Sequence, residues 1–172
     1  MKVLILYATK NGASLEAAQM LSNELKKRAD VSLIDVNGAL PSPSDFDVAV
    51  IGGSIRMGRL NARLKKYIKK NKEILSNMHS AAFICCGIGR DFDDYRVMQL
   101  PKDVNFSLGI HYFGGQLKPD RIKGIFDKII VKAMRESILT QDPDKSDFDR
   151  NELPELMPDT IRALAARILN LI

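Results

Sequence analysis

The 172-residue sequence contains little cysteine, no tryptophan and no long apolar run. Its two cysteines, Cys85 and Cys86, are neighbours, which excludes the disulfide framework that stabilises many small secreted proteins. No apolar stretch approaches the roughly 18 residues that cross a bilayer. The strand-like run after Met1 ends by Thr9, too early for the apolar core of a signal peptide. We therefore expect a cytoplasmic protein.

The composition is otherwise that of a soluble globular protein, with 45% hydrophobic and 27% charged residues, and we expect one domain over residues 1–172. A formal net charge of +5 indicates what the protein binds rather than how it folds. Part of this charge lies in a basic segment, 59–72, and part in residues 118–135. The basic side chains of the first are Arg59, Arg63, Lys65, Lys66, Lys69, Lys70 and Lys72. Such a run is typical of a solvated helix face, and alternatively of a surface that attracts an anionic partner.

Strand-like and helix-like segments alternate along the chain. Apolar runs predict strands, and helical spacing of apolar residues predicts helices. The strands are expected over 3–7, 31–36, 48–51, 81–86 and 108–113, and the helices over 13–28, 60–75, 122–133 and 158–172. Strands that are apolar on both faces predict a parallel sheet covered by helices on both sides. The polar stretch 140–155, rich in aspartate, predicts a surface loop.

The loop after the first strand has the residue types that a phosphate group requires. It reads Thr9, Lys10, Asn11, Gly12, Ala13 and Ser14, and it leads directly into a helix whose N-terminal N–H groups are free to bind an anion. The plainer interpretation is a loop that ends in an ordinary serine N-cap. A dinucleotide fingerprint and a Walker loop both require glycines that are missing here. A phosphoacceptor receiver domain would have an aspartate where the third strand ends in Gly52 and Gly53. A single phosphomonoester is the ligand that remains.

Two further glycine-rich loops follow the third and fourth predicted strands. One contains Gly52 and Gly53 followed by Ser54, Ile55, Arg56, Met57 and Gly58, and its glycines would let the backbone lie flat against a planar group. The other contains Gly87, Ile88, Gly89 and Arg90, with Tyr95 downstream. Ligands of open α/β sheets bind at the carboxyl ends of the strands, where all three loops are expected to lie.

These motifs resemble the flavodoxin superfamily. The pattern formed by Tyr7, Thr9, Gly12 and Ser14, together with the Ser54–Ile55–Arg56 loop, is similar to the branch that contains the menaquinone-dependent protoporphyrinogen IX dehydrogenases. The resemblance continues through Gly114 and residues 126–134, and so covers nearly the whole chain. It implies a flavodoxin-like three-layer sandwich with a five-stranded parallel sheet in the order 2-1-3-4-5.

The resemblance also implies FMN as cofactor and assigns residues to it. Thr9, Asn11, Gly12, Ala13 and Ser14 would hold the phosphate, with Lys10 contributing its backbone N–H. Ser54, Ile55, Arg56 and Met57 would border the isoalloxazine on one side. Gly87, Ile88, Gly89 and Arg90 would border it on the other side, with Tyr95 as a stacking partner. Arg56 and Arg90 are candidates for tuning the flavin through their charge, and the alternative for Arg56 is a surface ion pair. No metal site is expected, and His79 and His111 are interpreted as structural or surface residues. Cys85 and Cys86 point to opposite faces of a strand and are interpreted as buried structural thiols, the alternative being a redox pair.

The chain departs from both kinds of relative. Electron-carrier flavodoxins are usually acidic and flank the flavin with tryptophan or tyrosine, whereas this chain is basic. The connection between the last two strands is short and interrupted by Pro101, so its helix is expected to have only a turn or two.

Three functions therefore stay open. The first is an FMN-dependent oxidoreductase of porphyrin biosynthesis that passes electrons from protoporphyrinogen IX to a quinone. Its basic segment 59–72 would attract the propionates of the substrate, or contact the anionic inner face of the cell membrane. The second is an electron-transfer protein that docks a redox protein and has no small-molecule substrate. The third is an interaction domain without FMN, against which the intact phosphate loop argues. No nucleic-acid partner is expected.

Overall fold

The computed structural model describes residues 1–87, 91–115 and 155–171. Its sheet consists of β1 (Lys2–Ala8), β2 (Asp30–Asp35), β3 (Val48–Ser54), β4 (His79–Cys85) and β5 (Gly109–Tyr112). The strand order is β2-β1-β3-β4-β5, and every neighbouring pair is parallel. The predicted order and orientation are confirmed. Strand β3 continues three residues beyond its predicted end at Ile51, through Ser54.

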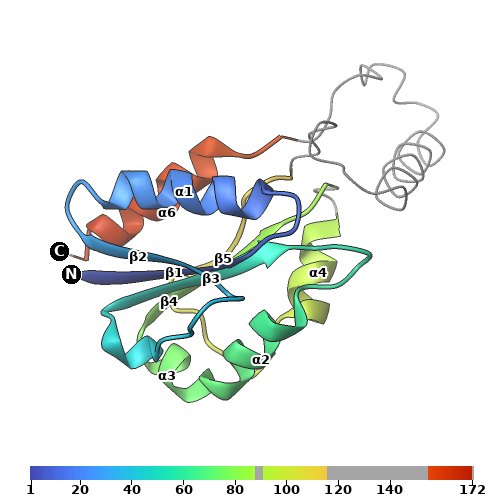
Figure 1. The fold of residues 1–172 in the computed structure, drawn as a ribbon, viewed down its shortest axis with the longest axis horizontal. Coiled ribbons are helices and arrows are strands. Elements are labelled where there is room, and N and C mark those ends of the chain that lie inside the picture. Colours follow the sequence, from blue (N-terminus) through green and yellow to red (C-terminus); the bar gives the residue numbers. More distant parts are fainter. Residues whose placement is uncertain (88–90, 116–154, 172) are drawn as a thin grey trace.

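Helices cover both faces of the sheet (Figure 1). Helix α1 (Ala13–Leu25) and helix α6 (Pro158–Leu169) pack against each other on one face. Helices α2 (Ala62–Lys70), α3 (Lys72–Asn77) and α4 (Phe92–Gln99) lie on the other. Helix α4 has 8 residues, which agrees with the short helix expected between the last two strands. The helix predicted over 122–133, the basic residues of 118–135 and nearly all of the acidic stretch 140–155 lie outside the described residues.

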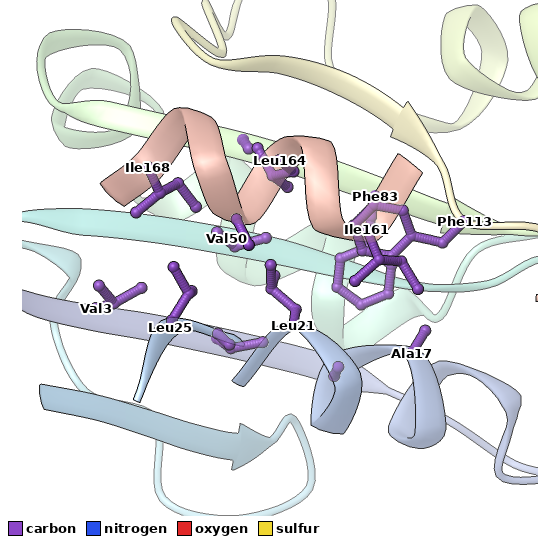
Figure 2. Close-up of a cluster of buried hydrophobic side chains, with 14 of the residues drawn as sticks. Val3, Ala17, Leu21, Leu25, Val50, Phe83, Phe113, Ile161, Leu164 and Ile168 are labelled. Atoms are coloured by element: carbon purple, nitrogen blue, oxygen red, sulfur yellow. The ribbon is translucent and has the colours of Figure 1, made fainter. Parts of the chain in front are cut away.

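A hydrophobic core fills the space between the sheet and each helical layer. Figure 2 shows the cluster on the α1 and α6 side, where Leu21 and Leu25 of α1 face Val3 and Val50 of the sheet. In the same cluster the rings of Phe83 and Phe113 stack with centroids 4.8 Å apart. The second cluster lies under α2, α3 and α4. Cys85 belongs to the first cluster and Cys86 to the second, which confirms that the two thiols are buried on opposite faces.

Two predicted helices have different bounds. The helix expected over 13–28 ends at Leu25, and the one expected over 60–75 is two helices, α2 and α3, that meet at Asn71. The Asn71 side chain donates to the Tyr67 carbonyl oxygen at 2.9 Å, and its backbone N–H donates to the same oxygen at 3.1 Å. An asparagine that binds the backbone in this way competes with helical hydrogen bonding, so the first helix ends there. The basic segment 59–72 therefore spans the end of the loop after β3, the whole of α2 and the start of α3, rather than a single helix.

Candidate functional site

The loops after β1, β3 and β4 meet at the carboxyl edge of the sheet. In the parallel ladder Ala8 is paired with Gly53, and Ser54 with Cys85. Just beyond the strands the Ile55 N–H donates to the Cys85 carbonyl oxygen at 2.8 Å. Figure 1 shows the N-terminal end of α1 and the segment after β3 at this same edge. Three of the predicted site segments are thus neighbours in space.

The loop between β1 and α1 ends at a helix without a side-chain cap. Gly12 is the N-cap residue, with φ of 89° in the left-handed region that glycine occupies without strain, and no side chain caps the helix. The Thr9 hydroxyl accepts a hydrogen bond from the Gly12 N–H at 3.0 Å, which closes the loop. Ser14 lies inside the first turn of α1, so the interpretation of this loop as an ordinary serine N-cap is wrong.

The Ser14 hydroxyl is an orphaned polar group at this helix end. The residue is fully buried, and its oxygen has no hydrogen-bond partner of regular geometry in the described part of the chain. The Cys85 thiol interacts with it. Burial raises the pKa of that thiol to about 12, while the Ser14 hydroxyl acts in the opposite direction. An orphaned hydroxyl and an uncapped helix start fit a phosphate group, whose oxygens accept hydrogen bonds from both.

The loop after β3 is a tight hairpin. Arg56 and Arg59 exchange two backbone hydrogen bonds, each 2.9 Å long. Between them Met57 and Gly58 have φ of 48° and 73°, the conformation of the two central residues of a type I′ turn. Met57 is 76% exposed at the tip of the hairpin, whereas Ile55 packs on the second core cluster. The backbone at Arg56 is therefore fixed by the turn.

The interpretation of Gly52 and Gly53 as glycines that approach a planar ligand needs correction. Both lie inside β3 and are buried. A Cβ atom on Gly52 would lie 2.2 Å from the Phe83 carbonyl oxygen of the paired strand and 2.3 Å from the ring of the same residue. The absence of a side chain at Gly52 is thus explained by packing within the sheet.

The loop after β4 leads into α4. Cys86 is buried and Gly87 half-buried, and Ile88, Gly89 and Arg90 lie outside the described residues. Tyr95 is half-buried on α4, where it packs against the second core cluster. Burial, with a smaller contribution from the Asp91 charge, raises the pKa of Tyr95. Its role as a stacking partner stays a prediction.

The end of β5 completes this edge, and sequence reasoning missed it as part of the site. The Cys86 N–H donates to the Gly114 carbonyl oxygen at 3.0 Å, and the Tyr112 hydroxyl donates to the Cys86 carbonyl oxygen at 2.9 Å. Gly114 also forms a bridge with Leu156, just before α6. The Gly114–Gly115 pair directly after an apolar strand is the signal that indicates this fourth loop.

The basic segment is partly engaged with the rest of the chain. Arg63 donates to the carbonyl oxygens of Asn37 at 3.3 Å and Gly38 at 3.1 Å. Lys65 donates to the Gln99 side chain at 3.3 Å, and Lys72 forms an ion pair with Asp103 at 2.9 Å. Arg59, Lys66, Lys69 and Lys70 are exposed, and their side chains form no hydrogen bond or ion pair of this kind with the described residues.

The histidines lie away from this edge. His79 is exposed at the start of β4, and the His111 ring is 2.9 Å from the Leu108 carbonyl oxygen near the start of β5. Burial lowers the pKa of His111. Within residues 1–87, 91–115 and 155–171 there is no group of three or more side chains suited to hold a metal ion, and no helix there is long and apolar enough to span a bilayer.

Comparison with known proteins adds three findings. A model of the family described as flavodoxin domain matches residues 4–147. The Escherichia coli K12 protein named protoporphyrinogen IX dehydrogenase (quinone) is 36% identical over 86 residues, which are 48% of this chain and 47% of that protein. A Leishmania major protein of the same name is 34% identical over 87 residues, or 48% of this chain and 37% of the relative. The matches therefore span about half the length of these relatives or less.

The solved structures show the fold alone. A flavodoxin from Streptococcus pneumonia TIGR4 superposes with a TM-score of 0.51 at 11% sequence identity, over 100% of both chains. The likeness therefore bears on the fold, whose strand order in this chain is β2-β1-β3-β4-β5.

Proposed function

The chain belongs to the flavodoxin domain family, and from this premise we propose that it is an FMN-dependent oxidoreductase whose cofactor binds at the carboxyl edge of the sheet. FMN, when bound, supplies hydride and electron transfer, so the protein's tasks are to bind and orient it. The observation on which the proposal rests is the uncapped start of α1, with the orphaned Ser14 hydroxyl beside it.

The phosphate would be held by the segment from Thr9 to Ser14. Gly12 gives the backbone its left-handed turn, and the free N–H groups at the start of α1 face the anion together with the positive end of the helix dipole. Lys10 is exposed and Asn11 half-buried in this loop. Ala13 is buried against the core and fixes the position of the first helical turn.

The ring would lie between the two loops that the Ile55–Cys85 hydrogen bond joins. Ser54, Ile55, Arg56 and Met57 would border it on one side, and Gly87, Ile88, Gly89 and Arg90 on the other. The type I′ turn makes the first border rigid, since its backbone is closed by two hydrogen bonds. Arg56 and Arg90 would supply positive charge beside the ring, and Tyr95 an aromatic face.

The substrate pair that we propose is protoporphyrinogen IX as electron donor and a quinone as acceptor. The names of the Escherichia coli and Leishmania major relatives support this choice. The exposed part of the basic segment supports it as well, because Lys66, Lys69 and Lys70 would attract the propionates of an anionic porphyrinogen. We place this activity in the cytoplasm, with the basic segment 59–72 in peripheral contact with the anionic inner face of the membrane.

The second candidate is an electron-transfer protein that reduces or oxidises another protein. The observation in its favour is the exposed apolar tip Met57, which the basic segment 59–72 follows closely along the chain, since cationic and apolar side chains suit an acidic redox partner.

The test begins with the purified protein. Visible flavin absorbance, with one FMN released per chain on denaturation, is the expected result, and a colourless protein that does not take up added FMN overturns the proposal. Anaerobic oxidation of protoporphyrinogen IX by a menaquinone is then followed through the fluorescence of the porphyrin product. Turnover by the holoprotein supports the enzyme. A holoprotein without turnover that exchanges electrons with a redox protein in a salt-sensitive manner refutes it and supports the second candidate.

A matched pair of variants tests the role of the basic segment. Lys66→Gln, Lys69→Gln and Lys70→Gln together remove three charges from the exposed side of α2, and Lys26→Gln, Lys27→Gln and Arg28→Gln remove three just after α1. We expect the first triple variant to raise KM for the porphyrinogen with kcat unchanged, and the second to change neither. Equal effects of the two would exclude a local role for the segment.

A further inference from the structure

The side chain of Gln99, the last residue of α4, binds the segment that follows the hairpin after β3. Its Oε1 atom accepts hydrogen bonds from the Leu60 N–H at 3.2 Å and from the Lys65 ammonium at 3.3 Å. Both partners are donors, so the oxygen of the amide, and not its nitrogen, faces them. Figure 1 shows α4 close to the segment between β3 and α2. Gln99 thus joins two parts of the chain that lie 39 positions apart in the sequence.

The Leu60 end of this link is continuous with a rigid loop. Leu60 directly follows Arg59, whose backbone exchanges two hydrogen bonds with that of Arg56 and so closes the type I′ turn. The Leu60 side chain is itself buried in the second core cluster. A bond to the Leu60 N–H therefore fixes the position of the whole hairpin and not only that of one residue.

The Gln99 end of the link lies on the inner face of α4. Tyr95 and Gln99 are half-buried, whereas the three residues between them, 96–98, are exposed. Because Tyr95 and Gln99 are four positions apart on a helix, they are neighbours on this face. The other end of α4 packs against β5, where the rings of Phe92 and Tyr112 have their centroids 5.5 Å apart. Helix α4 is thus held at one end to β5 and at the other to the segment after the hairpin.

We propose that Gln99 is a positioning residue for the cofactor: through its hydrogen bond to the Leu60 N–H it sets the separation between the hairpin after β3, which borders the flavin ring, and α4, which carries Tyr95. This inference rests on the proposed function, because it assumes that FMN binds between these two elements.

The physical reason is that packing alone leaves this separation free to vary. Ile55 of the hairpin and Tyr95 of α4 both pack against the second core cluster, but apolar contact is non-directional and lets one element slide past the other. The hydrogen bond from Leu60 to Gln99 has a preferred length and angle, so it selects one arrangement. Without it the free protein would populate several separations, and binding would have to select one of them, which weakens affinity.

The test compares Gln99→Met with Gln99→Glu. Methionine is similar in length to glutamine but has only a weak acceptor, whereas glutamate keeps an oxygen that can accept from both the Leu60 N–H and the Lys65 ammonium. Ser107→Ala is a matched control, because the Ser107 hydroxyl also accepts from a backbone N–H, that of Ser80, at 3.2 Å. That bond lies near the start of β4, at the edge of the sheet opposite to the proposed site.

Titration of the apoproteins with FMN, followed by quenching of flavin fluorescence, gives the dissociation constants. We expect Gln99→Met to raise Kd by about 3- to 10-fold, the effect of one neutral hydrogen bond, and Gln99→Glu and Ser107→Ala to leave it within about 2-fold. The visible circular dichroism of the bound flavin depends on the groups around the ring, so it should change in Gln99→Met alone. Without any ligand, the amide resonance of Leu60 should move in Gln99→Met, and that of Ser80 in Ser107→Ala.

The outcomes separate the two proposals. Wild-type protein that does not bind FMN overturns the proposed function and this inference with it. Wild-type protein that binds FMN, with Gln99→Met equal to it in Kd and in visible circular dichroism, overturns the inference alone. An equal rise of Kd in Gln99→Met and Ser107→Ala also overturns it, because the effect would then follow from general destabilisation. The inference fails as well if Gln99→Glu binds as weakly as Gln99→Met, or if the Leu60 amide resonance is unchanged in Gln99→Met.

Discussion

Replacing Gly52 with alanine separates a structural role of this glycine from a role in binding the cofactor. The added Cβ would lie 2.2 Å from the Phe83 carbonyl oxygen. That oxygen belongs to the backbone of the neighbouring strand, where Gly52 and Phe83 are ladder partners, so it cannot rotate away as a side chain could. Relief requires that β3 and β4 move apart at the centre of the sheet.

The expected cost follows from the nature of this clash. Overpacking of a core costs typically ~1–3 kcal/mol, and a clash with backbone belongs at the upper end, about 3 kcal/mol. With an m value of about 2 kcal/mol/M, the urea midpoint would fall by about 1.5 M. The measurement is urea unfolding of the apoprotein followed by circular dichroism, since bound FMN would itself stabilise the fold.

Two further variants make the result decisive. In Gly38→Ala the nearest atom to the new Cβ is the Asp35 oxygen at 3.3 Å, and we expect a change within about 1 kcal/mol. In Gly52→Ala combined with Phe83→Leu the clash with the ring is relieved but the clash with the carbonyl is not, so the double variant should be no more stable than Gly52→Ala. An apoprotein of Gly52→Ala as stable as wild type, with weakened FMN binding, would refute the structural explanation.

The remaining predictions concern single local features. Asn61 is the N-cap residue of α2, and its side chain accepts hydrogen bonds from the Arg63 and Leu64 N–H groups at 2.9 and 3.2 Å. Asn61→Ala should therefore lower the free energy of unfolding by about 1 kcal/mol, and an unchanged urea midpoint would contradict this role. Gly58→Ala should cost about 1 kcal/mol in the same assay, entirely from the backbone at φ of 73°, since no atom lies within 4 Å of the new Cβ. The Cys85 thiol should resist thiol reagents in the native protein at pH 8 and react in urea, and fast native labelling of Cys85 would show that it is not buried. Burial raises the pKa of this thiol from 9.0 to about 12, so above pH 9 the folded state retains a proton that the unfolded state loses. The free energy of unfolding should therefore fall as pH rises from 9 to 12, and it should fall more steeply in wild type than in Cys85→Ala.

Much of the fold could be predicted from local patterns. The runs in β1, β3 and β4 are apolar on both faces, and only a parallel sheet covered on both sides buries such strands. The alternation with helices then determines that the loops after these strands share one edge. Prediction of the loop from Thr9 to Ser14 as the start of a helix at that edge required no tertiary information.

Other features depend on contacts between residues that are distant in the sequence. The helix predicted over 60–75 breaks because the Asn71 side chain turns back onto the Tyr67 oxygen, a choice that apolar spacing does not reveal. Gly52 appeared to face a ligand until the register placed Phe83 beside it. The N-cap of α1 is Gly12 rather than Ser14, since the backbone makes its left-handed turn at the glycine.

By itself, then, the sequence determined the sheet, its layers and the edge where three loops gather, because these follow from the periodicity of apolar residues and from the chirality of parallel connections. Only the tertiary structure decided how the peptide groups at that edge are oriented. The bond between Tyr112 and Cys86 joins residues 26 positions apart, and it forms because the pairing of β4 with β5 brings the end of one strand beside the end of the other. Register depends on which residues of the two strands pack together in the core, so it is decided by contacts between segments that are distant in the sequence.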